Sequence, residues 1–476
     1  MNSEEFKKYG YQVIDWIVNY MDNIRDYPVM AQILPGDIFN SLPENPPDDP
    51  ESFDSILNDF DKILLKGITH WQHPNFHAYF PANNSYPSIL GELLSSALGA
   101  QAMIWQTSPA VAELEEKVMI WLRNLIGLPD GFEGVIQDTA STATLVSLLT
   151  AREKASSYEI NNNGIFNSKI LRVYCSTEAH SSIEKAMKIM GLGKKNLVKI
   201  AVDNNYAMLA DQLENAILND LRKGYKPLAV VAAFGTTGST AVDPIAQISK
   251  ICSKRNIWLH VDAAHAGSAL ILDEYKPLIN GIENADSFVF NPHKWLFTNF
   301  DCTAYFVRDK ESLIRTFEIY PEYLKTKYDN HVNNYRDWGI QLGRRFRALK
   351  LWFVIRSYGV TQLKEKIWTH IDITRKIEKI MINDNHFEIL APVNFNLICF
   401  RYKPNNIDDE EQINNFNSEL LSNINKTGKI YLSHTKLSGR FTIRLVFAQT
   451  NLTLEDAIKA FDIINQTAAN LMLKKD

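Results

Sequence analysis

From about residue 110 onward, amphipathic helical patterns alternate with short, almost continuously apolar segments, and this alternation limits the possible folds most strongly. The segment AVAELEEKVMIWLRNLIG reads as one such helix, with Gly127 as its C-terminal stop. The apolar segments are ILRVYCST, LAVVAAFGTT, IWLHVDAA and SFVFNPH, and the helical patterns between them cover residues 182–190, 210–222 and 245–255. Strands that are apolar on both faces are typical of a parallel sheet covered by helices on both sides. The sequence therefore predicts an α/β fold with a mostly parallel central sheet.

The sequences before and after this region show different patterns of apolar residues. Residues 5–25 have helical periodicity, and the proline-rich acidic segment LPGDIFNSLPENPPDDPESF that follows is not expected to form regular structure. That segment is either a solvated linker or an arm laid on another subunit, and the absence of its own core favours the arm. After Tyr358 a long helix precedes LICFRY and FTIRLVF, which predicts a small α+β domain. We expect an N-terminal helical segment (1–85), a large α/β domain (86–358) and a small C-terminal domain (359–476).

Composition and charge exclude several classes of function. A formal net charge of −5 argues against a nucleic-acid partner. The longest apolar runs are too short to span a bilayer, and the polar N-terminus predicts no signal peptide. Four isolated cysteines without metal spacing suit a reducing compartment, so we expect a cytoplasmic protein; they are Cys175, Cys252, Cys302 and Cys399.

Three predicted strand ends carry unusual polar residues, namely Thr236-Thr237, Asp262 and the Asn291–Lys294 turn. In open α/β sheets, ligands bind beyond the carboxyl ends of the strands. A lysine and an aspartate buried there would each need a compensating ligand. Pyridoxal 5′-phosphate (PLP) supplies both, because the lysine forms a Schiff base with its aldehyde and the aspartate keeps its pyridine nitrogen protonated. The small Ala263-Ala264 step would let a flat ring approach the backbone.

A PLP site also needs a place for the phosphate, and GVIQDTASTATLVSLLTAREKA offers one. Thr139, Ala140 and Ser141 stand at the start of a helix, where free N–H groups and the helix dipole favour an anion. An ordinary N-cap made by Asp138 explains the pattern about equally well. Both alternatives stay open at this point.

Two further motifs do not support a site. His70, His73 and His77 resemble a metal cluster, but Pro74 breaks any helix that would align them, so we expect no metal. The GLG at residues 191–193 follows a helix rather than a strand, which indicates a C-terminal cap and not a dinucleotide-binding loop.

The motifs SPAVAELE, VDAAHAGSA, NPHKW, QLGRRFRALKLWF and THW…YFP occur in this order, and with them the chain resembles the aromatic-L-amino-acid decarboxylases. These are the group II decarboxylases of fold type I PLP enzymes, and the resemblance runs nearly end to end. It implies a homodimer with the active site at the subunit interface, an N-terminal dimerisation segment (1–85), a PLP-binding large domain and a small C-terminal domain.

The resemblance also implies individual roles. Lys294 matches the lysine that binds the cofactor, and Asp262 the partner of the pyridine nitrogen. His180 matches the histidine that stacks on the ring, and Tyr323, on a segment that reads as a mobile lid, the tyrosine that helps deliver a proton to Cα. The remaining matches lie around the phosphate and the ring: Ala140, Ser141, Asn291, His293, Thr237 and Ala264. In relatives that make aldehydes, the tyrosine is typically Phe or the histidine is Asn, so the pair present here favours simple decarboxylation.

The resemblance places the substrate side chain in an aromatic pocket formed by Trp71, Tyr79, Phe80, Pro81 and Phe300, with Gln101 and Met103 from the partner subunit. Gly343 matches a position that is Gly in relatives taking large rings, whereas Ser is typical there in histidine decarboxylases and in plant tyrosine/DOPA enzymes. Ala82, Gln101, Met103 and His265 depart from the usual pattern.

Because Ala82 lacks the hydroxyl of DOPA-type relatives, strong catechol recognition is not expected. A pocket without dedicated polar partners discriminates ring substituents by only about a hundredfold or less. We therefore expect activity on Trp, Phe, Tyr, DOPA and 5-hydroxytryptophan, with Trp preferred. The alternatives are a narrow tyrosine/DOPA decarboxylase, an aromatic aldehyde synthase, or another fold type I PLP enzyme such as an aminotransferase.

Overall fold

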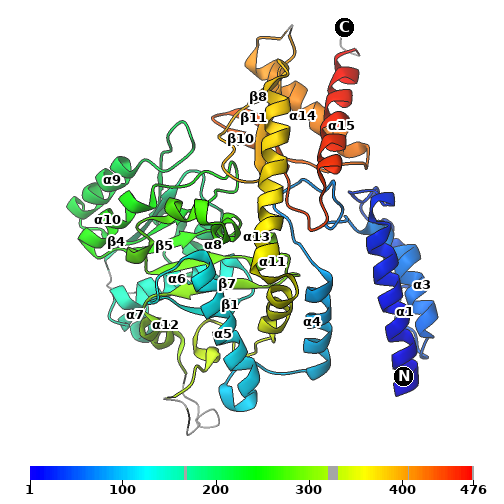
Figure 1. The fold of residues 1–476 in the computed structure, drawn as a ribbon. Coiled ribbons are helices and arrows are strands. Elements are labelled where there is room, and N and C mark those ends of the chain that lie inside the picture. Colours follow the sequence, from blue (N-terminus) through cyan, green and yellow to red (C-terminus); the bar gives the residue numbers. More distant parts are fainter. Residues whose placement is uncertain (166–168, 320–327, 329–330, 406, 474–476) are drawn as a thin grey trace. The chain divides into compact units, whose positions relative to one another are not determined.

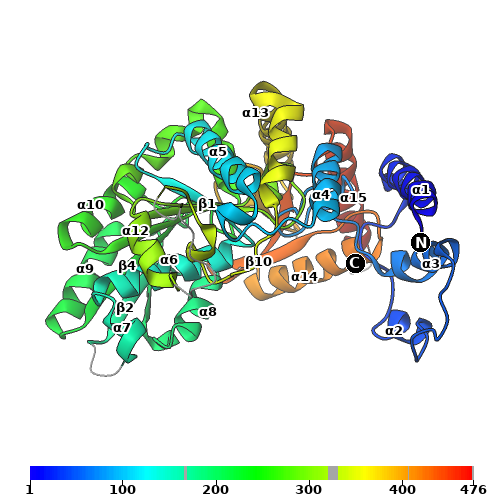
Figure 2. The same cartoon turned by 90° about the horizontal axis from the view of Figure 1, so that it is seen from below.

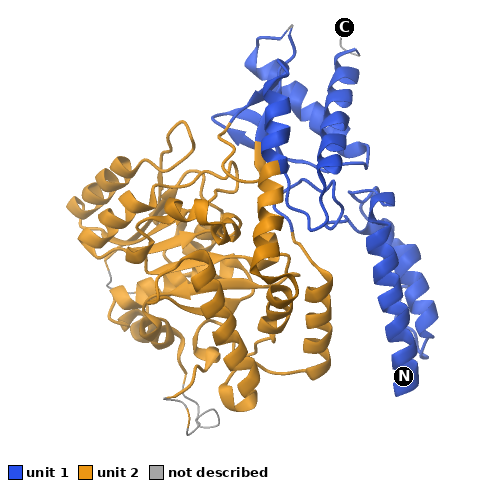
Figure 3. Cartoon of the chain, in the orientation of Figure 1, with its two compact units in different colours: residues 1–81, 373–390, 399–476 blue, residues 82–372, 391–398 orange. Residues whose placement is uncertain are grey.

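The computed structural model describes residues 1–476 except 166–168, 320–327, 329–330, 406 and 474–476 (Figures 1 and 2). The chain forms two compact units (Figure 3). Unit 1 comprises residues 1–81, 373–390 and 399–476, and unit 2 comprises residues 82–372 and 391–398. The division into three domains at residues 85 and 358 remains a prediction.

Unit 2 is built around a seven-stranded sheet of order β1-β7-β6-β5-β4-β2-β3. The strands β3, β2, β4, β5 and β6 run parallel to one another, and β7 is antiparallel to both β6 and β1. This confirms the predicted mostly parallel sheet. The strands are β1 Glu133–Gln137, β2 Leu171–Ser176, β3 Leu197–Ile200, β4 Lys226–Ala233, β5 Trp258–Asp262, β6 Ser287–Phe290 and β7 Thr303–Val307.

Helices cover both faces of this sheet, as its apolar strands require. Helix α6 lies over β4 to β7 with α8 and α12 beside it, and α9 and α10 pack on β3, β4 and β5 from the other side (Figure 2). The helices of unit 2 are α4 Tyr86–Leu98, α5 Pro109–Ile126, α6 Ala140–Ala155, α7 Glu159–Asn163, α8 Ser182–Ile189, α9 Ala210–Arg222, α10 Ile245–Arg255, α11 Pro292–Trp295, α12 Lys310–Phe317 and the first part of α13 Arg347–Ile382. Helix α5 ends at Gly127, as predicted, with φ 77°.

Unit 1 contains a four-stranded sheet of order β10-β11-β9-β8, in which β10 pairs antiparallel with β11 and β8 with β9. The predicted strands LICFRY and FTIRLVF are β9 and part of β11, which confirms the small α+β fold. The elements are α1 Ser3–Asp22, α2 Asp37–Ser41, α3 Phe53–Asp59, α14 Glu410–Lys426, α15 Leu454–Met472, β8 Phe387–Ile389, β9 Leu397–Tyr402, β10 Ser433–Leu437 and β11 Arg440–Val446.

The expectation of no regular structure in the proline-rich segment is wrong at one place. Helix α2 forms within it at residues 37–41, after Gly36 with φ 99°, where prolines are absent and the Leu34 N–H is bound by the Asp37 carboxylate at 2.7 Å. No described helix is long and apolar enough to cross a membrane.

Candidate active site

Three loops meet at the carboxyl ends of the neighbouring parallel strands β4, β5 and β6. The Ala263 N–H donates to the Val289 carbonyl at 2.9 Å, and the Asn291 N–H donates to the Ala264 carbonyl at 3.0 Å. After β4, Gly235 has φ 89°, and a Cβ there would lie 2.5 Å from the Cβ of Ala266. This close approach brings the loop carrying Thr236 and the exposed Thr237 against the loop that follows Asp262.

Lys294 lies on the short helix α11, half-buried, and Asn83 holds the turn that presents it. The Asn83 N–H donates to the His293 carbonyl at 3.2 Å, and its Nδ2 donates to the Lys294 carbonyl at 2.8 Å. The Lys294 N–H donates to the Asn291 carbonyl at 2.9 Å. Sequence reasoning missed Asn83, whose only signal is its position directly after the YFPA motif.

His180, after β2 and just before α8, lies where both Asp262 and Lys294 act on it electrostatically. Partial desolvation lowers the pKa of the His180 imidazole, with a raising effect from Asp262 and a lowering effect from Lys294. The Ser182 N–H donates to His180 Nδ1 at 3.2 Å, so the neutral ring carries its proton on Nε2. The three groups at these strand ends therefore share one electrostatic environment.

The start of α6 is capped by Thr139, whose hydroxyl accepts the Thr142 N–H at 3.3 Å. The alternative of an Asp138 cap is wrong. The Asp138 carboxylate instead accepts the Thr139 N–H at 2.5 Å and the Gln341 Nε2–H at 3.0 Å. The N–H groups of Ala140 and Ser141 belong to the first turn, where a helix offers no intrahelical acceptors.

Thr303, on β7, joins the helix start to the lysine turn. Its hydroxyl lies 2.8 Å from Asn291 Oδ1 and 3.0 Å from the Asp138 carbonyl. Asn291 itself is buried. Thr303 was also missed by sequence reasoning, because a threonine inside a predicted strand gives no signal of such a link.

His293 is buried beside Lys294, and its Nδ1 accepts the Cys302 N–H at 2.9 Å. Burial lowers the pKa of His293 to about 3, with further lowering by Lys294 and Lys350. The ring of the exposed Phe300 lies 4.6 Å from the His293 ring, between centroids. His293 is thus a neutral group under the lysine turn, and Phe300 lies at its side.

His265 and Trp295 form a buried stack behind the site, with ring centroids 5.0 Å apart and planes 8° from parallel. His265 Nε2 lies 2.8 Å from Asn396 Oδ1, and the Trp295 indole N–H donates to His370 Nδ1 at 2.9 Å. His265 stands where tyrosine is usual in the family that the chain resembles. It packs against Trp295, the residue that follows Lys294.

Four of the predicted pocket residues, Trp71, Tyr79, Phe80 and Pro81, belong to unit 1, and Ala82 is the first residue of unit 2. Within unit 1, the Trp71 and Tyr79 rings stack with centroids 6.0 Å apart, and the Arg444 guanidinium lies 5.1 Å from the Phe80 ring centroid. Phe80 and Pro81 are buried, whereas Tyr79 is 49% exposed. Trp71 and Tyr79 thus form an aromatic pair with an exposed side.

Gln101 and Gly343 line one cavity of about 310 Å³ in unit 2. Gln101 Oε1 accepts the Arg344 N–H at 2.6 Å, and a Cβ at position 343 would lie 3.4 Å from Gln101 Nε2. Met103, two residues after Gln101, is half-buried, and its carbonyl accepts the Arg336 N–H at 2.9 Å. Tyr323 lies outside the described residues.

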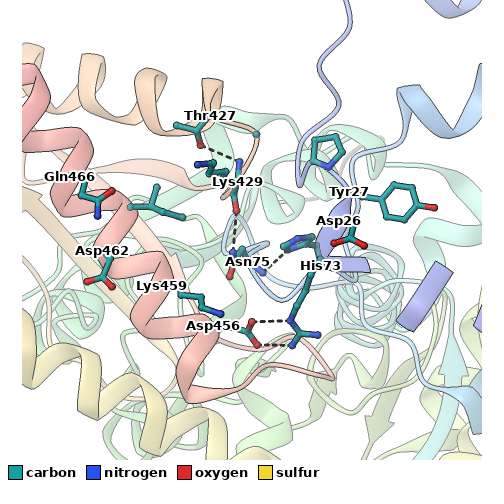
Figure 4. Close-up of a pocket in the computed structure, with 14 residues that line it drawn as sticks. Asp26, Tyr27, His73, Asn75, Thr427, Lys429, Asp456, Lys459, Asp462 and Gln466 are labelled. Atoms are coloured by element: carbon teal, nitrogen blue, oxygen red, sulfur yellow. Dashed lines mark hydrogen bonds and ion pairs between the residues drawn. The ribbon is translucent and has the colours of Figure 1, made fainter. Parts of the chain in front are cut away.

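A second cavity, of about 670 Å³, lies in unit 1 (Figure 4). Both acidic and basic side chains line it. Two of them, Arg25 and Asp456, form an ion pair with 2.8 Å between Nη2 and Oδ2. His73 lies at its edge with Nδ1 accepting the Asn75 N–H at 2.9 Å. None of the predicted active-site residues lines this cavity within the described part of the chain.

The three histidines of THWQHPNFH each have a separate partner. His70 Nδ1 lies 2.7 Å from the Tyr20 hydroxyl, and His77 Nδ1 lies 2.8 Å from the Val446 carbonyl. Among the described residues, no group of three or more His, Cys, Asp or Glu side chains could hold a metal ion.

The strand-end arrangement fits PLP. A half-buried lysine is available for the aldehyde, and a carboxylate at Asp262 for the pyridine nitrogen. The first turn of α6 offers free N–H groups and the positive end of the helix dipole for the phosphate, and the carboxylate of Asp138 is held by Gln341. The small side chains of Ala263 and Ala264 leave room for a flat ring.

The comparisons with known proteins agree with this fit. The family model of the pyridoxal-dependent decarboxylase conserved domain matches residues 35–403. Phenylacetaldehyde synthase of Arabidopsis thaliana is 43% identical over 100% of this chain and 98% of its own length. Tyrosine decarboxylase 4 of Petroselinum crispum is 41% identical over 99% of this chain and 95% of its own length.

Among solved structures, that of Oryza sativa TDC with PLP and tryptamine has a TM-score of 0.96 at 34% identity and covers 99% of both chains. The sequence match to the family model, the full-length relatives and the fold lead to one conclusion. The chain belongs to the PLP-dependent group II decarboxylase family, in its aromatic-amino-acid branch.

Proposed function

We propose that this chain removes the α-carboxyl group of aromatic L-amino acids and releases arylalkylamines and carbon dioxide. The observation that carries the proposal is that Asp262 ends β5 beside β6 and that the Asn291 N–H, at the turn that leads to Lys294, donates to the Ala264 carbonyl at 3.0 Å, which brings both residues to the carboxyl edge of the sheet. A lysine and an acid at one edge of the sheet suit a ring cofactor whose two ends need an amine and a carboxylate.

In this proposal Lys294 is the covalent anchor of the cofactor, and Asp262 keeps a proton at the pyridine nitrogen. Ala140 and Ser141 bind the phosphate through the first turn of α6, with Asn291 beside them, and Thr237, Ala264 and His293 complete the site. When bound, PLP supplies the electron sink that lets the carboxyl group leave as carbon dioxide.

His180 and Tyr323 control what happens at Cα. His180, neutral and protonated on Nε2, covers the reacting face and excludes water from it. Tyr323 delivers the proton that turns the decarboxylated substrate into an amine. The loss of carbon dioxide and the gain of one proton balance the overall reaction without an oxidant.

We propose that the enzyme accepts several aromatic amino acids and prefers Trp. The support is that position 343 is Gly, the residue of relatives that take large rings, and that Ala82 offers no hydroxyl to a catechol. Trp71, Tyr79, Phe80, Pro81 and Phe300 would form the rest of the pocket, with Met103. The solved rice relative was crystallised with tryptamine, which is consistent with the preference.

We further propose a homodimer in which Gln101 and Met103 reach the active site of the partner subunit. A run of exposed leucines on α4 supports a second copy as the occupant of this face: Leu90, Leu93, Leu94 and Leu98 are 46–65% exposed. A cytoplasmic location is supported by four cysteines that are buried and form no disulfide bond among the described residues.

The second candidate is an aromatic aldehyde synthase, which the 43% identical phenylacetaldehyde synthase favours. That reaction consumes oxygen and water and releases ammonia and hydrogen peroxide with the aldehyde and carbon dioxide. The presence of both His180 and Tyr323 favours the decarboxylase. A narrow tyrosine/DOPA decarboxylase is the alternative for the substrate, since tyrosine decarboxylases are 41% identical.

One experiment tests both the reaction type and the substrate preference. The PLP-loaded protein is given an equimolar mixture of Trp, 5-hydroxytryptophan, Tyr, DOPA, Phe, His and Glu, with and without oxygen, and products are identified by mass spectrometry. Amines in both conditions, led by tryptamine, support the proposal. Aldehydes that appear only with oxygen would establish the synthase, and tyramine and dopamine alone the narrow decarboxylase.

A further inference from the structure

A fully buried polar network lies beneath the strand ends, between α6 and strands β5 and β6. His260 Nδ1 lies 2.9 Å from the Ser287 hydroxyl, and its Nε2 lies 3.3 Å from the Thr144 hydroxyl. The hydroxyls of Ser147 and Ser287 are 2.7 Å apart, and the Trp258 indole N–H donates to Ser147 at 2.9 Å. The network therefore links one helix to two neighbouring strands.

The elements that it links carry the two ends of the cofactor site. Helix α6 begins with Ala140 and Ser141 at the phosphate end, and Thr144 and Ser147 lie one and two turns further along it. Strand β5 ends at Asp262, two residues after His260. Because side chains alternate along a strand, His260 and Asp262 share one face of β5. A shift of α6 along the sheet would change the distance between the phosphate and pyridine ends.

His260 is the only member of this described network that contacts the helix and a strand with two separate atoms in a rigid ring. Burial lowers the pKa of His260 to about 4, so the ring is neutral and has one donor and one acceptor nitrogen. Hydroxyls can donate or accept, so Thr144 and Ser287 satisfy either tautomer. A planar ring with both nitrogens engaged fixes the spacing better than a flexible side chain would.

We propose that His260 is a positioning residue that sets the separation of the phosphate-binding helix start from Asp262, and so gives the site its preference for phosphorylated cofactor. This inference rests on the PLP site proposed above. It assigns no chemistry to His260, which lies beneath the site and acts through α6.

The test compares two cofactors on the substrate-free protein. Apo-protein is titrated with PLP and with pyridoxal, which lacks the phosphate, and the dissociation constants are read from the visible absorbance of the lysine-bound cofactor. In His260→Leu and Thr144→Val, we expect PLP affinity to fall roughly tenfold while pyridoxal affinity changes little, since a lost buried hydrogen bond has about this effect. His260→Gln, which can still reach Thr144, should restore part of the preference.

Thr150→Val is the matched control. Thr150 is on the same helix and equally buried, but its hydroxyl donates to the Val146 carbonyl of α6 itself, at 2.9 Å. It should bind both cofactors like the wild type. If His260→Leu does not fold, Thr144→Val and His260→Gln decide the matter.

Equal losses for PLP and pyridoxal, or unchanged PLP binding in Thr144→Val, would overturn the inference. Because no substrate is present, these outcomes do not depend on which product the enzyme makes. Failure of the wild type to bind PLP at all would instead refute the proposed function.

Discussion

At the residue scale, the groups that carry the chemistry depend on neighbours that have no chemistry of their own. Asn83 binds the carbonyls of both His293 and Lys294, and so fixes the turn from which the lysine projects. Positioning of a reactive group matters strongly, because small displacements raise the barrier of the chemical step.

We therefore predict that Asn83→Ala lowers kcat about tenfold with a small change in the thermal midpoint, since one hydrogen bond from Nδ2 is lost. Steady-state kinetics at saturating PLP would measure this. Asn163→Ala is the control, because among the described residues its Nδ2 donates to Glu159 alone, within helix α7 and at 2.7 Å, and both side chains are exposed. A wild-type kcat in Asn83→Ala would contradict the role given to this residue.

The sequence allowed Lys294, Asp262 and Ala140 to be singled out because Asp262 ends a strand, Lys294 lies in the short turn after one, and Ala140 stands at a helix start. The supporting residues could not be predicted in this way, because their partners are distant in the chain. Along the sequence, Asn83 is 211 residues from Lys294. Thr303 is 165 residues and Gln341 is 203 residues from Asp138. No local pattern encodes such pairs.

At the scale of elements, periodicity predicted four strands of the seven-stranded sheet, β2, β4, β5 and β6, and helix α5, since each buries one recognisable apolar pattern, but it did not predict β1, β3 or β7. It did not predict α2, which is short and lies between prolines. Nor did it predict the close approach of α4 and α13 at Gly91. A Cβ there would lie 2.7 Å from Lys350 Cα, and Glu92 pairs with the fully buried Lys350 at 2.8 Å.

We predict that Gly91→Ala lowers the free energy of unfolding by about 1–3 kcal/mol, because backbone of α13 must move to admit the methyl group. Gly10→Ala is the opposite case. Nothing lies within 4 Å of a Cβ at that position in α1, so alanine should stabilise the helix by about 0.5–1 kcal/mol. Urea unfolding midpoints would measure both, and a neutral Gly91→Ala would mean that the two helices can separate without cost.

At the scale of the whole molecule, buried neutral histidines make stability depend on pH. Burial lowers the pKa of His73, His77 and His260 to about 4 and that of His293 to about 3, from an ordinary value near 6.5. Between these values the unfolded chain binds more protons than the folded one. The stabilisation is therefore present above pH 6.5 and is lost as the pH falls toward 4.

At pH 5.5 each of these histidines should lower the free energy of unfolding by about 1 kcal/mol relative to pH 7.5. Urea unfolding at both pH values would measure the sum. His77→Asn, which removes one of the four, should flatten the dependence even if the variant is less stable overall. A profile that is as steep in His77→Asn as in the wild type would contradict this account.

The lysine that holds the cofactor can be identified directly, and this measurement decides whether the strand-end site is the active site. The PLP-loaded protein is reduced with borohydride and digested, and its peptides are sequenced by mass spectrometry. We predict a single modified residue, Lys294, and no modification and no amine product in Lys294→Ala. A pyridoxyl group on another lysine of an active wild-type enzyme, or multiple turnovers by Lys294→Ala, would contradict the site described above.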